Sequence, residues 1–148
     1  MAHIHPPGFP IERGKIHEFA NSILDDNPLY HDEQAAKAQG LPSVVAPPTF
    51  ASAAAFFPES GGGGMRLEGI DMRFALHGGQ ELIFERPLFA GDVLRADPGT
   101  SKSYEKDGKR GGKMKFFETE VAYCDASGGI VLRVRNTLIQ TAGVVQDR

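Results

Sequence analysis

The segment Leu24 to Tyr30 holds the residues of this sequence best suited to proton transfer. Asp25 is followed by Asn27-Pro28, and Tyr30 stands five positions after Asp25. Adding water across the double bond of an enoyl thioester needs a base for the water and an acid for the carbon, and an Asp and a His five positions apart can meet that need; here Tyr30 stands at the position of the His. The segment therefore predicts hydration or dehydration chemistry, with Asp25 and Tyr30 as candidate catalytic residues.

The second candidate, Tyr30, is a weak proton carrier. A tyrosine titrates near pH ~10, far above neutrality. His31 stands one residue later, and one step along a helix rotates a side chain by roughly 100°, so His31 is not an automatic replacement. We place Asn27, which can orient water or substrate, and His31 among the substrate-binding residues. The same segment is also typical of a helix end followed by a turn, because Asp and Asn favour turns and the residue before proline leaves the helical region.

Two helices are predicted around this segment. Apolar residues recur at helical spacing from Ile16 to Leu24, which predicts an amphipathic helix that ends near Asp25. Asp32 is a suitable N-cap for a short second helix over 33–38, and Gly40 would end that helix in a left-handed conformation. The candidate site is thus expected just beyond a helix end.

The rest of the chain predicts one buried helix and then a sheet. The run from Phe50 to Phe57 is apolar almost all round, which is typical of a helix buried on every side. From Glu81 onward, side chains alternate with a period of two in five stretches, which predicts strands. The stretches are 81–85, 92–96, 101–105, 113–123 and 130–140. The predicted fold class is α+β, a curved antiparallel sheet wrapped around a central helix.

Composition sets the class of protein. A chain of 148 residues is long enough for one core, so we expect a single domain over 1–148, with residues 1–10 flexible. The net charge of −3 argues against nucleic-acid binding, and no apolar run reaches membrane-spanning length. One cysteine, Cys124, excludes an internal disulfide, and we interpret it as a packing residue. We expect a cytoplasmic protein with no cofactor and no metal.

A local basic stretch has two interpretations. Its members are Lys102, Lys106, Lys109, Arg110, Lys113 and Lys115. The stretch is either the solvated surface of a hairpin or an attraction for phosphates such as those of coenzyme A.

The ordered motifs of the chain resemble the MaoC-type hydratase/dehydratase superfamily, in its MaoC N-terminal or FAS1-like dehydratase branch. Those motifs run from Ile11 to Thr141: Phe19-Ala20, Asp25 to Tyr30, Asp32-Glu33, Val45 to Phe50, Leu76-His77-Gly78, Arg86 to Asp92, Tyr104 to Lys106, Gly111 to Met114 and Thr137 to Ile139. The resemblance implies the hot-dog fold, substrates carried on coenzyme A or acyl carrier protein, and side-by-side pairing of subunits. We expect the last strands of the chain to serve as the paired edge.

The resemblance also locates the donors for the thioester oxygen. Catalytic members of the superfamily typically have a His-Gly pair before the central helix, whereas this chain has Pro47-Pro48. Proline has no N–H, so a donor would come from Thr49 or Phe50. Pro48, Thr49 and Phe50 are therefore the remaining candidate substrate-binding residues. Proline in a first helical turn is also simply favourable for a helix start.

Three functional hypotheses follow. In the first, the chain is the acyl-binding component of a hydratase/dehydratase acting on (R)-3-hydroxyacyl/trans-2-enoyl thioesters, and a MaoC-type partner supplies the complete Asp/His pair. In the second, a homodimer is a self-sufficient enoyl-CoA hydratase that uses Asp25 as the base. In the third, the chain is a non-enzymatic acyl-binding protein or a thioesterase, because a fold does not fix a chemistry.

Overall fold

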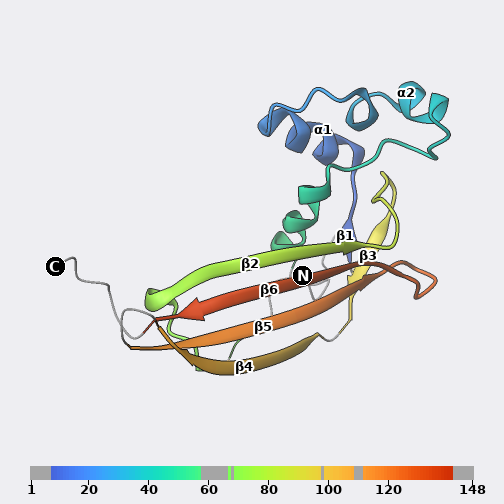
Figure 1. Cartoon of the computed structure of the whole chain (residues 1–148). Coiled ribbons are helices and arrows are strands. Elements are labelled where there is room, and N and C mark those ends of the chain that lie inside the picture. The colour runs from blue at the N-terminus through green and yellow to red at the C-terminus, as the bar shows by residue number, and fades with distance from the viewer. Residues whose placement is uncertain (1–7, 58–66, 68, 98, 109–111, 142–148) are drawn as a thin grey trace, which may run out of the picture.

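The computed structural model describes residues 8–57, 67, 69–97, 99–108 and 112–141. In these ranges one antiparallel sheet carries a few short helices, and the two α-helices lie at the end of the sheet that holds β1 and β3 (Figure 1). The glycine run at 61–64 lies outside the described residues, as do residues 1–7 of the segment expected to be flexible.

After the short strand β1 come the helices, and the remaining strands of the sheet follow them. The strands are β1 (Phe9–Pro10), β2 (Ala75–Phe84), β3 (Val93–Ala96), β4 (Thr100–Asp107), β5 (Lys113–Cys124) and β6 (Ile130–Gln140). The helices are α1 (Arg13–Ser22), α2 (Glu33–Ala38) and the 3-10 helices η1 (Pro28–Tyr30), η2 (Pro48–Phe56) and η4 (Met72–Phe74). The predicted strands over the second half of the chain are present, and β6 has the predicted bounds.

Strand order corrects one expectation about the sheet. The order is β1-β3-β5-β6-β2, with β4 also paired to β5. The last strand, β6, therefore lies between β5 and β2 and is not an edge. Strand order depends on contacts between distant parts of the chain, which the alternation within β6 does not encode. In the described sheet, the long edge strand on this side is β2.

The two faces of the sheet differ in character. Val121, Val134 and Leu82 are cross-strand neighbours and belong to the face that packs with the core. One residue earlier or later, Glu120, Arg135 and Glu81 are neighbours on the opposite face. This period of two is what a sheet with one buried face requires.

The hydrophobic core contains side chains from the helices, the strands and the segments between them. Its largest fully buried side chains include Phe9, Ile11, Ile16, Leu88, Leu94 and Leu132. Phe9 is 1% exposed although it falls within the stretch expected to be flexible, because β1 pairs with β3 and directs this ring into the core. Residues 9 and 10, which were expected to be flexible, therefore belong to the sheet.

The predicted central helix differs from expectation in two ways. It is a nine-residue 3-10 helix, η2, and only Phe50, Ala51 and Ala54 are buried in it. Phe56 is 84% exposed. An apolar sequence predicted burial on every side, but the described chain covers one side of η2 only. The outer side is left for another molecule or for solvent.

Candidate functional site

Asp25 is positioned by the way helix α1 ends. Ile16 and Ala20 anchor α1 in the core, as its spacing predicts, whereas Leu24 is 92% exposed rather than buried. The N–H of Asp25 donates to the oxygen of Ala20 at 2.9 Å, and the N–H of Leu24 donates to that of Asn21 at 3.1 Å. These two bonds form a Schellman motif, which needs a left-handed residue, and Leu24 supplies it with φ of 57°.

Asn27 stabilises the turn in which it lies. Its Oδ1 accepts a hydrogen bond from the N–H of Leu29 at 3.1 Å, which caps η1. Its own N–H donates to Oδ1 of Asp25 at 3.1 Å. The turn chemistry of this segment is therefore present, and the Asn27 side chain is engaged in it rather than turned toward a substrate.

Tyr30 does not line the described cavity that Asp25 lines. Tyr30 lies in η1, and its side chain packs against the hydrophobic core. Asp25 lines a cavity of about 420 Å³ together with five other residues. Those residues are His17, Asn21, Leu24, Asp26 and His31. The cavity thus brings His31, but not Tyr30, to the side of Asp25.

His17 is the member of this cavity that the sequence analysis missed. It lies on the exposed side of α1, and its Nδ1 is 2.7 Å from Nδ1 of His31. The Nε2 of His31 is 2.9 Å from the main-chain oxygen of Asp25. Both ring nitrogens of His31 are therefore engaged inside the protein. The available signal was the spacing of four between His17 and Asn21, which places both on one helix face.

The N-terminus of η2 offers one free donor for an oxyanion. The N–H of Phe50 donates to the oxygen of Pro47 at 2.9 Å, so it is already engaged. Pro48 and Thr49 are exposed and line neither the Asp25 cavity nor the groove described next. Of the two predicted donors, only the Thr49 N–H lacks a bond to another described residue.

An apolar groove of about 460 Å³ runs between α1 and η2. Its lining residues are Phe9, Pro10, Lys15, Glu18, Phe19, Ser22, Phe50, Ala53, Phe56 and Phe57. Side chains three apart eclipse in a 3-10 helix, which aligns Phe50, Ala53 and Phe56 along the groove. The rings of Phe9 and Phe19 meet that of Phe50 at centroid distances of 5.9 and 5.4 Å. The groove is thus a preformed aromatic channel that can hold an apolar chain.

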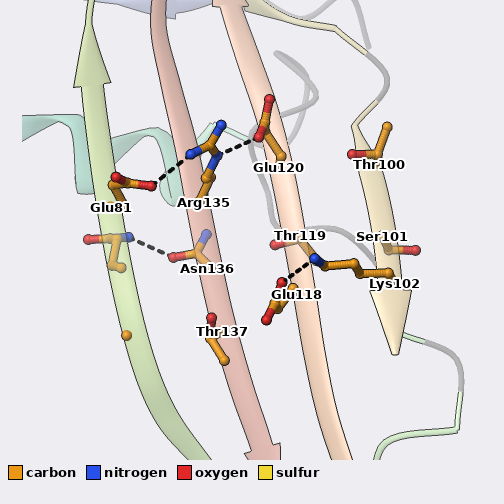
Figure 2. A pocket seen from close by; sticks show the side chains of 12 residues that line it. Glu81, Thr100, Ser101, Lys102, Glu118, Thr119, Glu120, Arg135, Asn136 and Thr137 are labelled. Carbon is orange, nitrogen blue, oxygen red and sulfur yellow. Dashed lines mark hydrogen bonds and ion pairs between the residues drawn. The ribbon is translucent and has the colours of Figure 1, made fainter. Parts of the chain in front are cut away.

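A third hollow, of about 720 Å³, crosses the four strands β2, β6, β5 and β4 (Figure 2). Its charged groups are already paired: Arg135 with Glu81 at 3.0 Å and with Glu120 at 2.5 Å, and Lys102 with Glu118 at 2.8 Å. The hollow contains three carboxylates and two cations, and this excess of negative charge disfavours the binding of an anionic thioester. Its polar walls also disfavour the binding of an acyl chain. We interpret this hollow as an ion-paired outer face of the sheet.

The basic stretch is also mostly engaged. Lys102 and Lys113 pair with Glu118 and Glu105, and Lys106 lies over the stacked rings of Tyr104 and Phe116. Lys109 and Arg110 lie outside the described residues. The described lysines favour the interpretation of a solvated hairpin over a phosphate site.

Cys124 is buried, at 7% exposed, and its Sγ donates to Asp97 at 3.4 Å. Burial raises the pKa of this thiol, and the Asp97 carboxylate raises it further. A thiol held protonated is a poor nucleophile, as expected for a packing residue.

Among the described residues no cluster of three His, Cys, Asp or Glu side chains could hold a metal ion. No described helix is long and apolar enough to cross a membrane.

These features define a class, a curled antiparallel sheet with few helices that corresponds to the hot-dog fold of the MaoC-like dehydratases. The family model described as "FAS1-like, dehydratase domain region" matches residues 2–134. The chain therefore belongs to this family.

Curated relatives carry names without a function. A UPF0336 protein of Parafrankia sp. (strain EAN1pec) is 40% identical over 129 residues, which cover 83% of this chain and 78% of the relative. A UPF0336 protein of Saccharopolyspora erythraea is 43% identical over 60% of this chain and 57% of its own length. The matches span about 57 to 61% of the length of the first such relatives.

Solved structures share the fold. The HadBC (3R-hydroxyacyl-ACP dehydratase) complex of Mycobacterium tuberculosis aligns with a TM-score of 0.63 and 23% identity, covering 90% of this chain and 91% of that one. The ChsH1-ChsH2 complex of the same organism aligns with a TM-score of 0.65 and 22% identity, covering 92% and 86%. Both are complexes of hot-dog subunits.

Proposed function

We propose that this chain is the acyl-binding subunit of a heteromeric hydratase/dehydratase that acts on (R)-3-hydroxyacyl/trans-2-enoyl thioesters. A MaoC-type partner would supply the complete Asp/His pair. The thioester would be carried on coenzyme A or on acyl carrier protein.

The observation that carries this proposal is that every ring nitrogen of the two histidines in the Asp25 cavity already has a hydrogen-bond partner, so that the free groups beside Asp25 include a second carboxylate, Asp26, but no free imidazole. Tyr30 packs against the core, and both ring nitrogens of His31 are engaged, one with His17 and one with the Asp25 main chain. Two carboxylates without a free imidazole do not form the Asp/His pair that this hydration uses. The missing half is best supplied by another subunit.

The apolar groove supports acyl binding. Burial of each acyl methylene contributes roughly 0.8 kcal/mol, and three aligned side chains of η2, Phe50, Ala53 and Phe56, line the groove. An 84% exposed phenylalanine at position 56 is costly to display to water unless a ligand or a partner covers it.

The sheet edge supports a partner subunit. Strand β2 pairs only with β6 in the described sheet, and its ten residues leave one row of main-chain groups open. An edge of this length is usually covered or paired. The structural neighbours HadBC and ChsH1-ChsH2 are complexes, and we assign the β2 edge to the corresponding contact in this protein.

A second candidate keeps catalysis in this chain. Asp25 and His31 do line one cavity, which favours a self-sufficient homodimeric hydratase. In that version His31 would have to release His17 or the Asp25 main chain before it could transfer a proton.

One experiment separates the two candidates. The purified chain is tested for hydration of a short and a long trans-2-enoyl-CoA, alone and co-expressed with a MaoC-type chain that has the full Asp/His pair. We expect no turnover alone and turnover in the complex, with Asp25→Asn leaving that turnover largely intact. Turnover by the chain alone, abolished by Asp25→Asn, would establish the homodimeric hydratase instead. No turnover in either form would favour a binding protein.

A further inference from the structure

A chain of three hydrogen bonds connects helix α1 to the main chain of Asp25. Nδ2 of Asn21 lies 3.0 Å from Nε2 of His17, Nδ1 of His17 lies 2.7 Å from Nδ1 of His31, and Nε2 of His31 lies 2.9 Å from the oxygen of Asp25. The two imidazole rings meet edge to face, with an interplanar angle of 88°. The sequence separation of 14 between His17 and His31 makes this contact tertiary rather than local.

The Asp25 oxygen, at one end of this series of hydrogen bonds, determines which atom donates in each of them. A carbonyl oxygen only accepts, so Nε2 of His31 donates to Asp25, and the Nδ1 of a neutral His31 must accept. The donor to that nitrogen is then the Nδ1–H of His17, which leaves the Nε2 of His17 to accept from the amide of Asn21. Each ring nitrogen has one role, so each neutral histidine has one tautomer.

Packing does not explain His17. Ile16 and Ala20 bury the inner side of α1, whereas His17 is exposed and contributes little apolar burial. What His17 adds is a hydrogen-bond donor aimed at a single nitrogen of His31. A leucine at position 17 would occupy similar space without that donor.

We propose that His17 is a positioning residue: its Nδ1–H binds the accepting Nδ1 of His31 and, together with the Asp25 oxygen, selects the neutral tautomer of His31 that holds the main chain of Asp25 at the wall of the Asp25 cavity. Neither this tautomer nor the position of Asp25 depends on the proposed function. His17 itself acts only through His31.

The test reads the tautomers directly by nitrogen NMR of the full chain with labelled histidine, near pH ~8, above the ordinary titration of histidine. We expect Nε2–H for His31 and Nδ1–H for His17. His17→Gln keeps an amide donor and should keep the His31 signal, whereas His17→Leu should convert it to a mixture of tautomers and shift the carbonyl carbon of Asp25. His77→Leu, an exposed histidine on β2, is the matched control and should change neither signal.

Two results would overturn the proposal. The first is a His31 signal and an Asp25 carbonyl shift that are the same in His17→Leu as in the unmodified chain. The second is rapid exchange between both tautomers of His31 in the unmodified chain. Neither the His31 signal nor the Asp25 carbonyl shift depends on catalytic activity. The test therefore decides the proposal about His17 even if the proposed function is wrong.

Discussion

The Nε2 atom of His31 bonds the main-chain oxygen of Asp25, at 2.9 Å, rather than a carboxylate oxygen of Asp25. The two residues lie side by side in one cavity, as a hydratase would require, yet the contact between them fixes a turn and transfers no proton. The carboxylate of Asp25 instead accepts the N–H of Asn27. This geometry is the basis for placing the complete acid/base pair in a partner.

Restoring the motif by Tyr30→His should not create a hydratase. The side chain at position 30 packs against the core, so an imidazole there would lie outside the Asp25 cavity and bury a polar ring. We expect no gain in enoyl-CoA hydration by the isolated chain and a loss of about 1–3 kcal/mol in the free energy of unfolding. Denaturant unfolding and a hydration assay measure both, with Tyr30→Phe as the control of near-normal stability. Hydration by the Tyr30→His chain alone would contradict this view of position 30.

Leu24→Gly should stabilise the chain. Leu24 adopts a left-handed conformation with φ of 57° and is 92% exposed, so it carries strain and gives little burial in return. Glycine has no such strain, and we expect a gain of about 1 kcal/mol in the free energy of unfolding. Leu24→Ala keeps the strained φ and should give no gain. Equal unfolding midpoints for the glycine and alanine variants would show that strain at this position is negligible.

Local chemistry made several elements predictable. Asp32 caps α2, with its Oδ1 accepting the N–H of Gln34 at 2.7 Å, and Gly40 has φ of 77°, as their residue types predict. The alternation from 130 to 140 gave the bounds of β6. The curved antiparallel sheet followed from the same period of two.

Relationships between distant residues were not predictable. The exposure of Phe56 depends on what covers η2, and the central place of β6 depends on its pairing with β2. His17 meets His31 only because the Schellman motif turns the chain back toward α1. Sequence spacing reports one helix face or one strand, so it named Asp25 and His31 from one segment and missed His17, which reaches them from α1.

Ala53→Leu should weaken the binding of long acyl chains. Ala53 is the small residue between Phe50 and Phe56 on the side of η2 that lines the groove. A larger side chain would displace two or three methylenes, which is about 2 kcal/mol or roughly 30-fold in Kd. Calorimetry with a long and a short acyl-CoA measures the difference, and Ala55→Leu, exposed on the same helix outside the groove, is the control. An equal effect of both variants would place the acyl chain elsewhere.

Arg86→Ala should destabilise the fold more than the removal of a surface arginine. Arg86 binds both carboxylate oxygens of Asp92 at 2.7 and 3.0 Å, and Asp92 also accepts the N–H of Phe89. The loss leaves a largely buried carboxylate without its cation, at a cost of about 1–3 kcal/mol. Arg135→Ala, which removes two exposed ion pairs, to Glu81 and to Glu120, should cost under about 1 kcal/mol in the same denaturant titration. The reverse ranking would contradict this assignment.

Alkaline pH should destabilise the chain through two neighbouring residues of β5. Burial raises the pKa of Tyr123, and burial together with Asp97 raises the pKa of Cys124. Groups with a raised pKa in the folded state contribute stability that is complete below their unfolded pKa, near 9.0 for Cys and 10.0 for Tyr, and that is lost as the pH rises toward the folded value. Melting temperatures at about pH 8 and about pH 10 should therefore diverge less in a Cys124→Ala, Tyr123→Phe double variant than in the unmodified chain. An identical fall in both proteins would assign the alkaline loss of stability to other groups.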